Sequence, residues 1–236
     1  MTDWFAGEVA ARYDAETADM PVVPVVDFLL PLAGGGALEL AIGTGRIALP
    51  LAARGAHVAG IDLSPDMVAE LRKKPGGDAI PVAIGDMTTT GVDGMFSLAY
   101  VVYNSIFNLR TQERQIACFE NVSAHLEPGG VFVVEIMVPA LQRLPLGDRF
   151  LLFDASPEHV GFDEYDLVTQ ELTSHHYDPE RGTYSTFPGR YIWPSELDLM
   201  ARLAGLELRE RWADWDRSPF TAESTKHVSV WEKPSG

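Results

Sequence analysis

Cysteine is almost absent from this sequence, which has Cys118 alone among 236 residues. One cysteine forms neither an internal disulfide nor a zinc cluster, so both are excluded and a reducing compartment is expected. Long apolar runs are also missing, because Pro21, Pro24 and Pro31 interrupt the longest one, residues 20–36. It therefore falls short of the roughly 18 consecutive apolar residues of a membrane span, and no membrane partner is expected.

Basic residues are scarce: 18 Lys and Arg stand against 34 Asp and Glu, which gives a formal charge of −16 and an isoelectric point near 4.6. A nucleic-acid partner needs a positively charged surface, so none is expected. A neutral or cationic small molecule fits this charge, although acidity is also a common means of solubility. Asp3 and Glu8 stand where a signal peptide would be basic, which predicts a cytoplasmic location.

The apolar content of 46% is sufficient for one ordinary folded domain, residues 1–236. Between residues 37 and 136, short β-rich runs alternate with helical segments. We expect strands at residues 37–42, 57–62, 79–84, 96–102 and 131–136, with helices at 46–54, after Ser64 and after Thr111. This alternation predicts a parallel, doubly wound α/β sheet with right-handed crossovers.

After residue 139 the pattern changes to alternating runs at 167–177 and 183–192, joined by a polar turn at 178–182. Such runs predict an antiparallel hairpin. Pro194 and Ser195 then begin a helix, and residues 206–212 and 226–232 are expected as the last two strands. The chain is therefore expected to carry an antiparallel insertion within an α/β domain.

A glycine-rich loop, residues 43–48, follows the first expected strand and fits the pattern G-x-G-x-x-G/A. Glycines let a ligand approach the backbone, and the helix N-terminus faces it. Asp62 comes 19 residues after Gly43, at the end of the second strand, where its carboxylate can accept hydrogen bonds from both ribose hydroxyls. These features do not separate sites for NAD, FAD and S-adenosylmethionine (AdoMet).

Two acidic residues distinguish between these cofactors. Glu39 places a charge inside the first strand, where dinucleotide folds usually have an apolar residue. Asp86 and Met87 follow the third strand, where a carboxylate can accept from an adenine amino group and a methionine can lie on the base. Both features favour AdoMet.

At these residues the sequence resembles class I AdoMet-dependent methyltransferases. Residues 38–45 match the first motif of that family, 60–64 its ribose motif, 85–87 its adenine motif and 125–131 its passage into the fifth strand. The resemblance covers about residues 10–136. It implies a seven-stranded Rossmann-like sheet with an antiparallel insertion after the fifth strand, AdoMet as cofactor and S-adenosylhomocysteine as product. Ala41 departs from the family's usual glycine, and its methyl group would crowd the amino-acid tail of the cofactor.

The resemblance divides the chain into a helical cap at residues 1–30, an AdoMet-binding core at 34–138, a substrate lid at 139–193 and a C-terminal part at 194–236. It implies cofactor contacts from Tyr13, Glu39, Ala41, Gly43, Gly45, Asp62, Leu63, Asp86, Met87 and Val102. Each acidic residue has a plainer alternative: Glu39 as a satisfied strand carboxylate, Asp62 as a neighbour of the helix cap and Asp86 as a turn residue. Arg46 is expected on a helix face, away from the ligand.

The resemblance is strongest to small-molecule N- and O-methyltransferases, including aminosugar dimethyltransferases. Those enzymes place an antiparallel insertion over the donor methyl and close an N-terminal helix with a Tyr-Asp step, here Tyr13-Asp14, on the ligand. Residues 102–105 lack the Asn/Asp-Pro-Pro-Tyr signature of base-modifying and protein-glutamine methyltransferases. The acidic pattern of metal-dependent catechol-type enzymes is also missing. We therefore expect a small-molecule acceptor, no nucleic acid and no metal.

Residues after the fourth strand and in the lid are candidates for holding the acceptor. His175 and His176 are candidate bases, and they point to opposite faces of a strand, so at most one faces the methyl group. The alternative for each is a structural hydrogen bond. The other candidates lie at the crevice beyond the fourth strand or wall the acceptor: Tyr103, Asn104, Phe107, Tyr191 and Trp193.

The sequence therefore predicts methyl transfer from AdoMet to a small-molecule nitrogen or oxygen by in-line displacement, in secondary metabolism, by a monomer or homodimer. Proximity and orientation can supply most of the catalysis. The alternatives are a non-enzymatic AdoMet-binding module and an NAD-dependent oxidoreductase.

Overall fold

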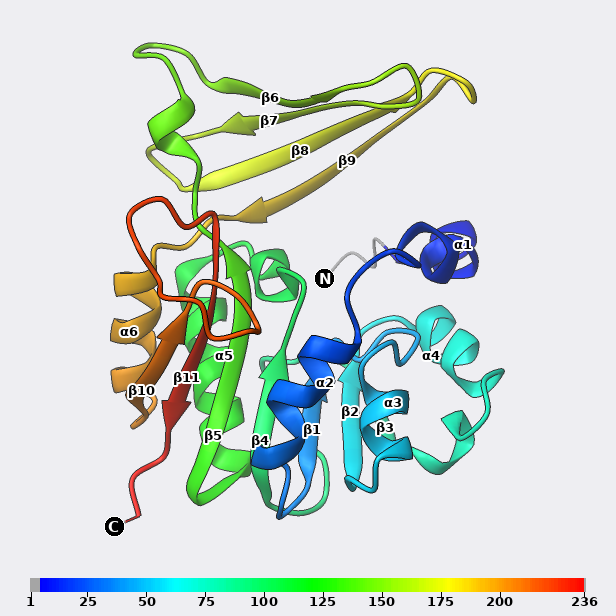
Figure 1. The fold of residues 1–236 in the computed structure, drawn as a ribbon, viewed down its shortest axis with the longest axis vertical. Coiled ribbons are helices and arrows are strands. Elements are labelled where there is room, and N and C mark those ends of the chain that lie inside the picture. The colour runs from blue at the N-terminus through cyan, green and yellow to red at the C-terminus, as the bar shows by residue number, and fades with distance from the viewer. Residues whose placement is uncertain (1–4, 236) are drawn as a thin grey trace.

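A seven-stranded sheet forms the middle of the computed structural model, which describes residues 5–235 (Figure 1). Its strands lie in the order β3 (Val82–Ile84), β2 (Val58–Asp62), β1 (Ala37–Leu40), β4 (Phe96–Val101), β5 (Leu126–Met137), β11 (Lys226–Glu232) and β10 (Glu207–Trp212). The first five are parallel, and β11 is antiparallel to both of its neighbours. The predicted doubly wound sheet is confirmed.

Helices cover both faces of this sheet. One face carries α2 (Val23–Leu29), α3 (Ala48–Ala53) and α4 (Pro65–Arg72), and the other carries α5 (Gln112–His125) and α6 (Pro194–Leu203). Every residue of β1 is buried, which explains the nearly continuous apolar run of this strand. An additional helix, α1 (Glu8–Glu16), lies against α4. Among the helices of residues 5–235, none is both long and apolar enough to cross a membrane.

In the central sheet, two strands begin several residues away from their predicted starts. The third strand begins at Val82 instead of 79, because Gly77–Ala79 form the 3₁₀ turn η2. The fifth strand begins at Leu126 instead of 131, because Leu126 already pairs with Phe96 of β4 before the ladder shifts register. The expected helix caps are present: the hydroxyl groups of Ser64 and Thr111 each accept a hydrogen bond from a backbone N–H of the first turn.

The insertion forms a separate antiparallel sheet, whose order is β6 (Phe150–Ala155), β7 (Val160–Tyr165), β8 (Glu171–Asp178) and β9 (Thr183–Arg190). The predicted hairpin joins β8 to β9, and the sequence had not resolved β6 and β7. This lid sheet lies above the carboxyl ends of the parallel strands (Figure 1). Two further 3₁₀ turns are Leu30–Leu32 (η1) and Leu141–Arg143 (η4).

A small apolar cluster holds the lid on the core. Phe107 lies in η3 (Ser105–Asn108), the 3₁₀ turn after β4, and packs with buried Tyr165, Leu172 and Tyr191. A Cβ at Gly189 would lie 1.9 Å from the ring of Phe107, so β9 crosses η3 where it has no side chain. The predicted helical cap contains α1 and α2, while its residues 1–4, and residue 236 at the other end, lie outside the described chain.

Candidate active site

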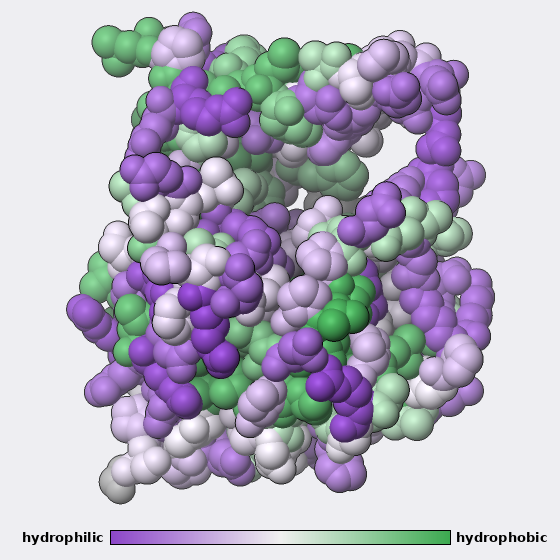
Figure 2. Space-filling view, viewed as in Figure 1, coloured by the Kyte–Doolittle hydropathy of each residue, from purple (hydrophilic) through white to green (hydrophobic). Residues whose placement is uncertain are grey.

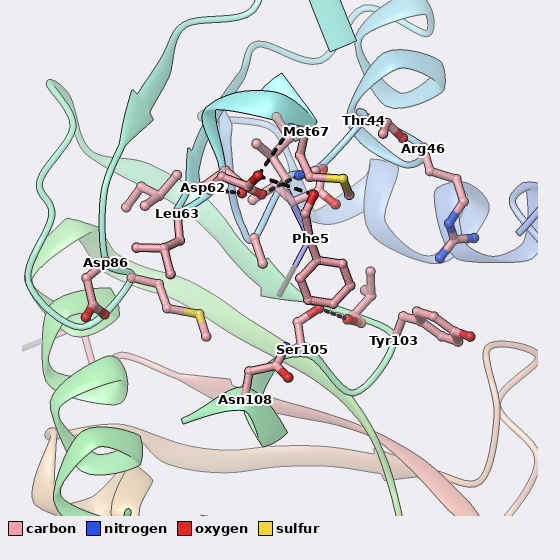
Figure 3. Close-up of a pocket in the computed structure, with 18 of the residues that line it drawn as sticks. Phe5, Thr44, Arg46, Asp62, Leu63, Met67, Asp86, Tyr103, Ser105 and Asn108 are labelled. Atoms are coloured by element: carbon pink, nitrogen blue, oxygen red, sulfur yellow. Dashed lines mark hydrogen bonds between the residues drawn. The ribbon is translucent and has the colours of Figure 1, made fainter. Parts of the chain in front are cut away.

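A pocket of about 350 Å³ opens at the carboxyl ends of β1, β2 and β4 (Figure 3). This is the point where the strand order reverses, and it is where open α/β sheets bind ligands. The volume lies in the range of small-molecule sites, roughly 300–1,000 Å³. Predicted residues that line it are Tyr13, Glu39, Ala41, Gly43, Asp62, Leu63, Asp86, Met87, Val102 and Tyr103.

The glycine loop after β1 turns sharply, with positive φ angles at Ala41 (53°), Gly43 (56°) and Gly45 (77°). An alanine in this left-handed region costs about 1–2 kcal/mol, which glycine avoids. Gly45 does not line the pocket. A Cβ there would lie 2.3 Å from Cδ1 of Leu71, so this glycine lets the loop pack against α4.

Asp62 connects the glycine loop to the start of α4. Its Oδ2 accepts a hydrogen bond from the backbone N–H of Gly43 at 2.6 Å, and its Oδ1 accepts one from Ser64 at 2.8 Å. Figure 3 shows the carboxylate in the pocket wall. Asp62 is therefore both a neighbour of the α4 helix cap and a carboxylate in the pocket wall, and its hydrogen bonds to the backbone fix its position.

Glu39 is a buried carboxyl group at the floor of the pocket, with 3% of its surface exposed. Burial raises its pKa to about 8, against the opposing hydrogen bond from Tyr100 and the charge of Arg46. The hydroxyl of Tyr100 donates to Oε2 of Glu39 at 2.8 Å. A carboxyl group with this pKa becomes charged readily when a cation is placed beside it.

Arg46 was expected on a helix face, but the structure places it in the pocket wall. Its guanidinium lies 5.7 Å from the centroid of the Tyr103 ring, and Nη1 is buried without a hydrogen-bond partner among residues 5–235. A buried, unsatisfied guanidinium nitrogen is costly, and an anionic ligand group relieves that cost. The sequence did contain a signal for this placement: Arg46 comes directly after Gly45, in the glycine loop and before α3 begins.

The N-terminal helix closes over the glycine loop. Asp14 accepts a hydrogen bond from the Thr44 hydroxyl at 2.6 Å and pairs with Lys74 at 2.5 Å. Tyr13 beside it faces the pocket, where burial raises its pKa to about 12. The ring of Phe5, which sequence reasoning missed, also projects into the pocket (Figure 3).

At the opposite end of the pocket, Asp86 accepts hydrogen bonds from the backbone and hydroxyl of Thr88 at 3.0 and 2.8 Å. Its other oxygen pairs with Arg114. Burial raises the pKa of Asp86, but the bonds from Arg114 and Thr88 outweigh burial and hold it below its ordinary value. Asp86 therefore makes the hydrogen bonds of a turn residue and also lines the pocket. Further lining residues that the sequence did not suggest are Ser105, Asn108, Arg110 and Arg114.

The predicted acceptor residues are divided between two environments. Tyr103 lines the pocket, whereas Asn104 accepts a hydrogen bond from the backbone of Met137 at 2.7 Å and fixes the turn after β4. Phe107 and Tyr191 are buried in the cluster that seats the lid. Trp193 packs edge-on against Tyr191. The structure therefore brings only Tyr103 of this group to the pocket.

The two candidate bases lie on opposite faces of β8, as the alternation predicts. His175 stacks on Phe162, with ring centroids 4.5 Å apart, and bonds to the Tyr184 hydroxyl. His176 bonds to His159 and Ser174. Neither lines the pocket. In the described chain no group of three or more His, Cys, Asp or Glu side chains is arranged to hold a metal ion.

Comparison with known proteins agrees with this geometry. Residues 37–130 match a family model described as a methyltransferase domain. The chain is similar to the structure of the CcbJ methyltransferase from Streptomyces caelestis, with 35% identity, 96% of each chain covered and a TM-score of 0.82. It is 29% identical over 218 residues to a cypemycin N-terminal methyltransferase of Streptomyces sp, covering 86% of this chain and 85% of that one.

A third relative matches a shorter part of the chain. The dTDP-3-amino-3,4,6-trideoxy-alpha-D-glucopyranose N,N-dimethyltransferase of Streptomyces venezuelae is 33% identical over 126 residues, covering 52% of this chain and 50% of that one. The sheet order, the pocket at its reversal point and the full-length similarity to a solved methyltransferase lead to one family. The chain belongs to the S-adenosylmethionine-dependent methyltransferases.

Proposed function

We propose that this enzyme transfers a methyl group from AdoMet to a nitrogen or oxygen of a small molecule in secondary metabolism. The observation that carries the proposal is the pocket that combines the buried Nη1 of Arg46, which has no hydrogen-bond partner among residues 5–235, with the carboxyl groups of Glu39 and Asp62. These groups suit the zwitterionic tail and the ribose of AdoMet. Nitrogen is the favoured acceptor atom, because two relatives are N,N-dimethyltransferases of amino sugars.

Each part of the cofactor has a chemical counterpart in the pocket. Arg46 suits the carboxylate of the methionine tail, and Glu39 suits its ammonium group. Asp62 and Leu63 line the pocket and suit the ribose, and Asp86 and Met87 line it and suit the adenine. Bound AdoMet supplies a methyl group on a sulfonium, and the protein supplies position. Residues 34–138 are then the cofactor core and residues 139–193 the acceptor lid.

The acceptor would approach from the side of the lid, past Tyr103 and η3. The remaining task of the protein is to align the nucleophile with the methyl group, and such alignment accounts for a large part of the catalysis of many two-substrate reactions. The proposal involves no metal, because the sequence lacks the acidic pattern of metal-dependent catechol-type enzymes.

The direct test is the transfer of an isotope-labelled methyl group from AdoMet to a panel of amines, amino sugars, phenols, alcohols and carboxylic acids, detected by mass spectrometry. We expect label on an amine. AdoMet binding without label on any compound would favour a non-enzymatic binding module. Binding of NAD in place of AdoMet would favour the oxidoreductase.

AdoMet binding is expected to release a proton. Burial raises the pKa of Glu39 to about 8, so at lower pH this carboxyl group is protonated. A cationic ligand beside it favours ionisation, lowers its pKa and makes binding tighter as pH rises, by up to about tenfold per pH unit. Calorimetry between about pH 5.5 and 7, below the α-amino pKa of the ligand, measures this slope.

The matched variant for this experiment is Glu39→Gln, which preserves an oxygen that can accept from Tyr100. In this variant the pH slope and the released proton should both disappear. A wild-type affinity that is independent of pH over the same range would contradict the contact between Glu39 and the ammonium group.

A further inference from the structure

The carboxylate of Asp86 is held by donors from two separate parts of the chain. Its Oδ1 accepts the backbone N–H and the hydroxyl of Thr88, at 3.0 and 2.8 Å. Its Oδ2 accepts a hydrogen bond from Nη2 of Arg114, which lies 28 residues further along, in the first turn of α5. A carboxylate has about four positions at which it accepts hydrogen bonds. Residues 5–235 use three of them, so Oδ2 can accept one more N–H.

The start of α5 places Arg114 for this contact. Thr111 caps the helix, and its hydroxyl accepts the backbone N–H of Arg114 at 3.3 Å. From this anchored position the Arg114 side chain reaches Asp86, and both residues line the cofactor pocket. The residue that holds Asp86 is therefore part of the pocket wall itself, on an element that the adenine motif does not include.

Asp86 remains accessible to water, because 23% of its side chain is exposed. Figure 2 also shows an opening between the lid and the N-terminal part of the chain. A carboxylate that turns freely in such a place exchanges its partners with water and discriminates poorly between ligands. Recognition of one particular N–H needs a group whose orientation is fixed before the ligand arrives. Thr88 fixes one oxygen of Asp86, and Arg114 fixes the plane of the group by holding the other.

Arg114 also keeps Asp86 ionised. Burial raises the pKa of this carboxyl group, but the hydrogen bond from Arg114, followed by those from Thr88, lowers it below its ordinary value. At neutral pH the group is therefore a carboxylate, which accepts hydrogen bonds and donates none. Adenine carries an amino group, which donates, where its deaminated form hypoxanthine has a carbonyl oxygen. An ionised Asp86 binds the amino group and repels the carbonyl oxygen.

We propose that Arg114 is a positioning residue that makes the cofactor site selective for adenine, and that it acts through Asp86. This inference rests on the proposed function. Without Arg114, Thr88 still holds Oδ1, but the carboxyl group can turn about that contact and takes up a proton more readily. A protonated carboxyl group donates to a carbonyl oxygen, so hypoxanthine is then tolerated. Loss of Arg114 should therefore reduce the preference for adenine over hypoxanthine in an otherwise intact pocket.

The test compares the binding of S-adenosylhomocysteine with that of S-inosylhomocysteine, which carries hypoxanthine in place of adenine. In calorimetric titrations, the wild-type protein should bind the adenine ligand roughly 100-fold more tightly, within the range of a hydrogen bond to a charged group. Asp86→Asn, whose amide can donate to a carbonyl oxygen, should nearly abolish this preference. Arg114→Met should reduce it by about tenfold, because the contacts of Thr88 remain.

Two further variants separate positioning from a general structural effect. Arg54→Met removes an exposed pair with Asp27 outside the pocket, so it is the matched control and should leave the preference unchanged. Arg114→Lys keeps the positive charge and should retain part of the preference. In an Asp86→Asn background, Arg114→Met should have little further effect, because two residues that act through one contact are not additive.

Thermal unfolding shows whether each variant is folded, and Arg114→Gln takes the place of Arg114→Met if the latter is not. A folded variant of Arg114 with the wild-type preference overturns the inference. So does a tenfold loss of preference that is the same with Asp86 and with Asp86→Asn, because Arg114 would then act on the ligand directly. A wild-type protein that binds both ligands equally removes the adenine role of Asp86, and the inference with it. A wild-type protein that binds neither ligand overturns the proposed function itself.

Discussion

Replacing Asp62 with alanine is expected to weaken AdoMet binding by roughly 10- to 150-fold, which corresponds to about 1.5–3 kcal/mol for lost hydrogen bonds to a charged group. The carboxylate lies in the pocket wall beside Leu63, where we place the ribose hydroxyls. It also accepts the backbone N–H groups of Gly43 and Ser64. The substitution therefore removes a ligand contact and loosens the glycine loop that shapes the pocket.

Calorimetric titration of AdoMet measures this effect, and thermal unfolding of the same samples shows whether the variant is folded. Asp78→Ala is a suitable control, because Asp78 is an exposed carboxylate that does not line the pocket. Asp62→Asn, which retains one acceptor oxygen, should lie between wild type and alanine. A folded Asp62→Ala protein with wild-type affinity would disprove the ribose assignment.

Replacing Arg190 with methionine is expected to destabilise the fold by about 3–5 kcal/mol, because it leaves the partly buried carboxylate of Glu196 without its cation. Arg190 pairs with Glu196 at 2.6 Å and donates to Gln115 and Gln170 at 2.6 and 2.9 Å. Only 7% of the Arg190 side chain is exposed. These contacts fasten the last lid strand to α5 and α6, so the loss should also misplace the lid.

Thermal unfolding should show a decrease in Tm of roughly 6–20 °C for a chain of this size. Burial raises the pKa of Glu196, but hydrogen bonds from Arg190, Gln170 and Gln112 outweigh burial and lower it below 4.5. The stabilisation is therefore present above about pH 4.5 and is lost as pH falls through the lowered pKa, where variant and wild type should converge. Arg181→Met, which removes an exposed pair with Asp178 in the same lid, should change Tm little. Equal Tm values for the two variants at neutral pH would contradict the stabilising role of Arg190.

Much of the cofactor site could be predicted from local sequence, since its residues are the ends of strands and the loops that follow them. Glu39, Gly43, Asp62 and Asp86 lie near the carboxyl ends of β1, β2 and β3, and parallel strands bring those ends to one edge. Pattern and spacing were sufficient for that. The orientation of the Arg46 side chain could not be predicted from pattern and spacing, because it depends on how the loop turns through three residues of positive φ.

The sequence by itself determined the doubly wound sheet, its glycine loop and the acidic residues at the sheet edge, because each follows from periodicity and position along one strand or turn. Only the tertiary structure decided which lid residues meet. His159 and His176 are 17 positions apart, and they contact each other because Gly161 pairs with His176 across β7 and β8. In the same way Phe107 and Tyr191 became supports of the lid, and Asn104 became a support of the turn after β4. Pairing register and packing between distant segments, which no local pattern encodes, separate the residues that line the pocket from those that hold it in place.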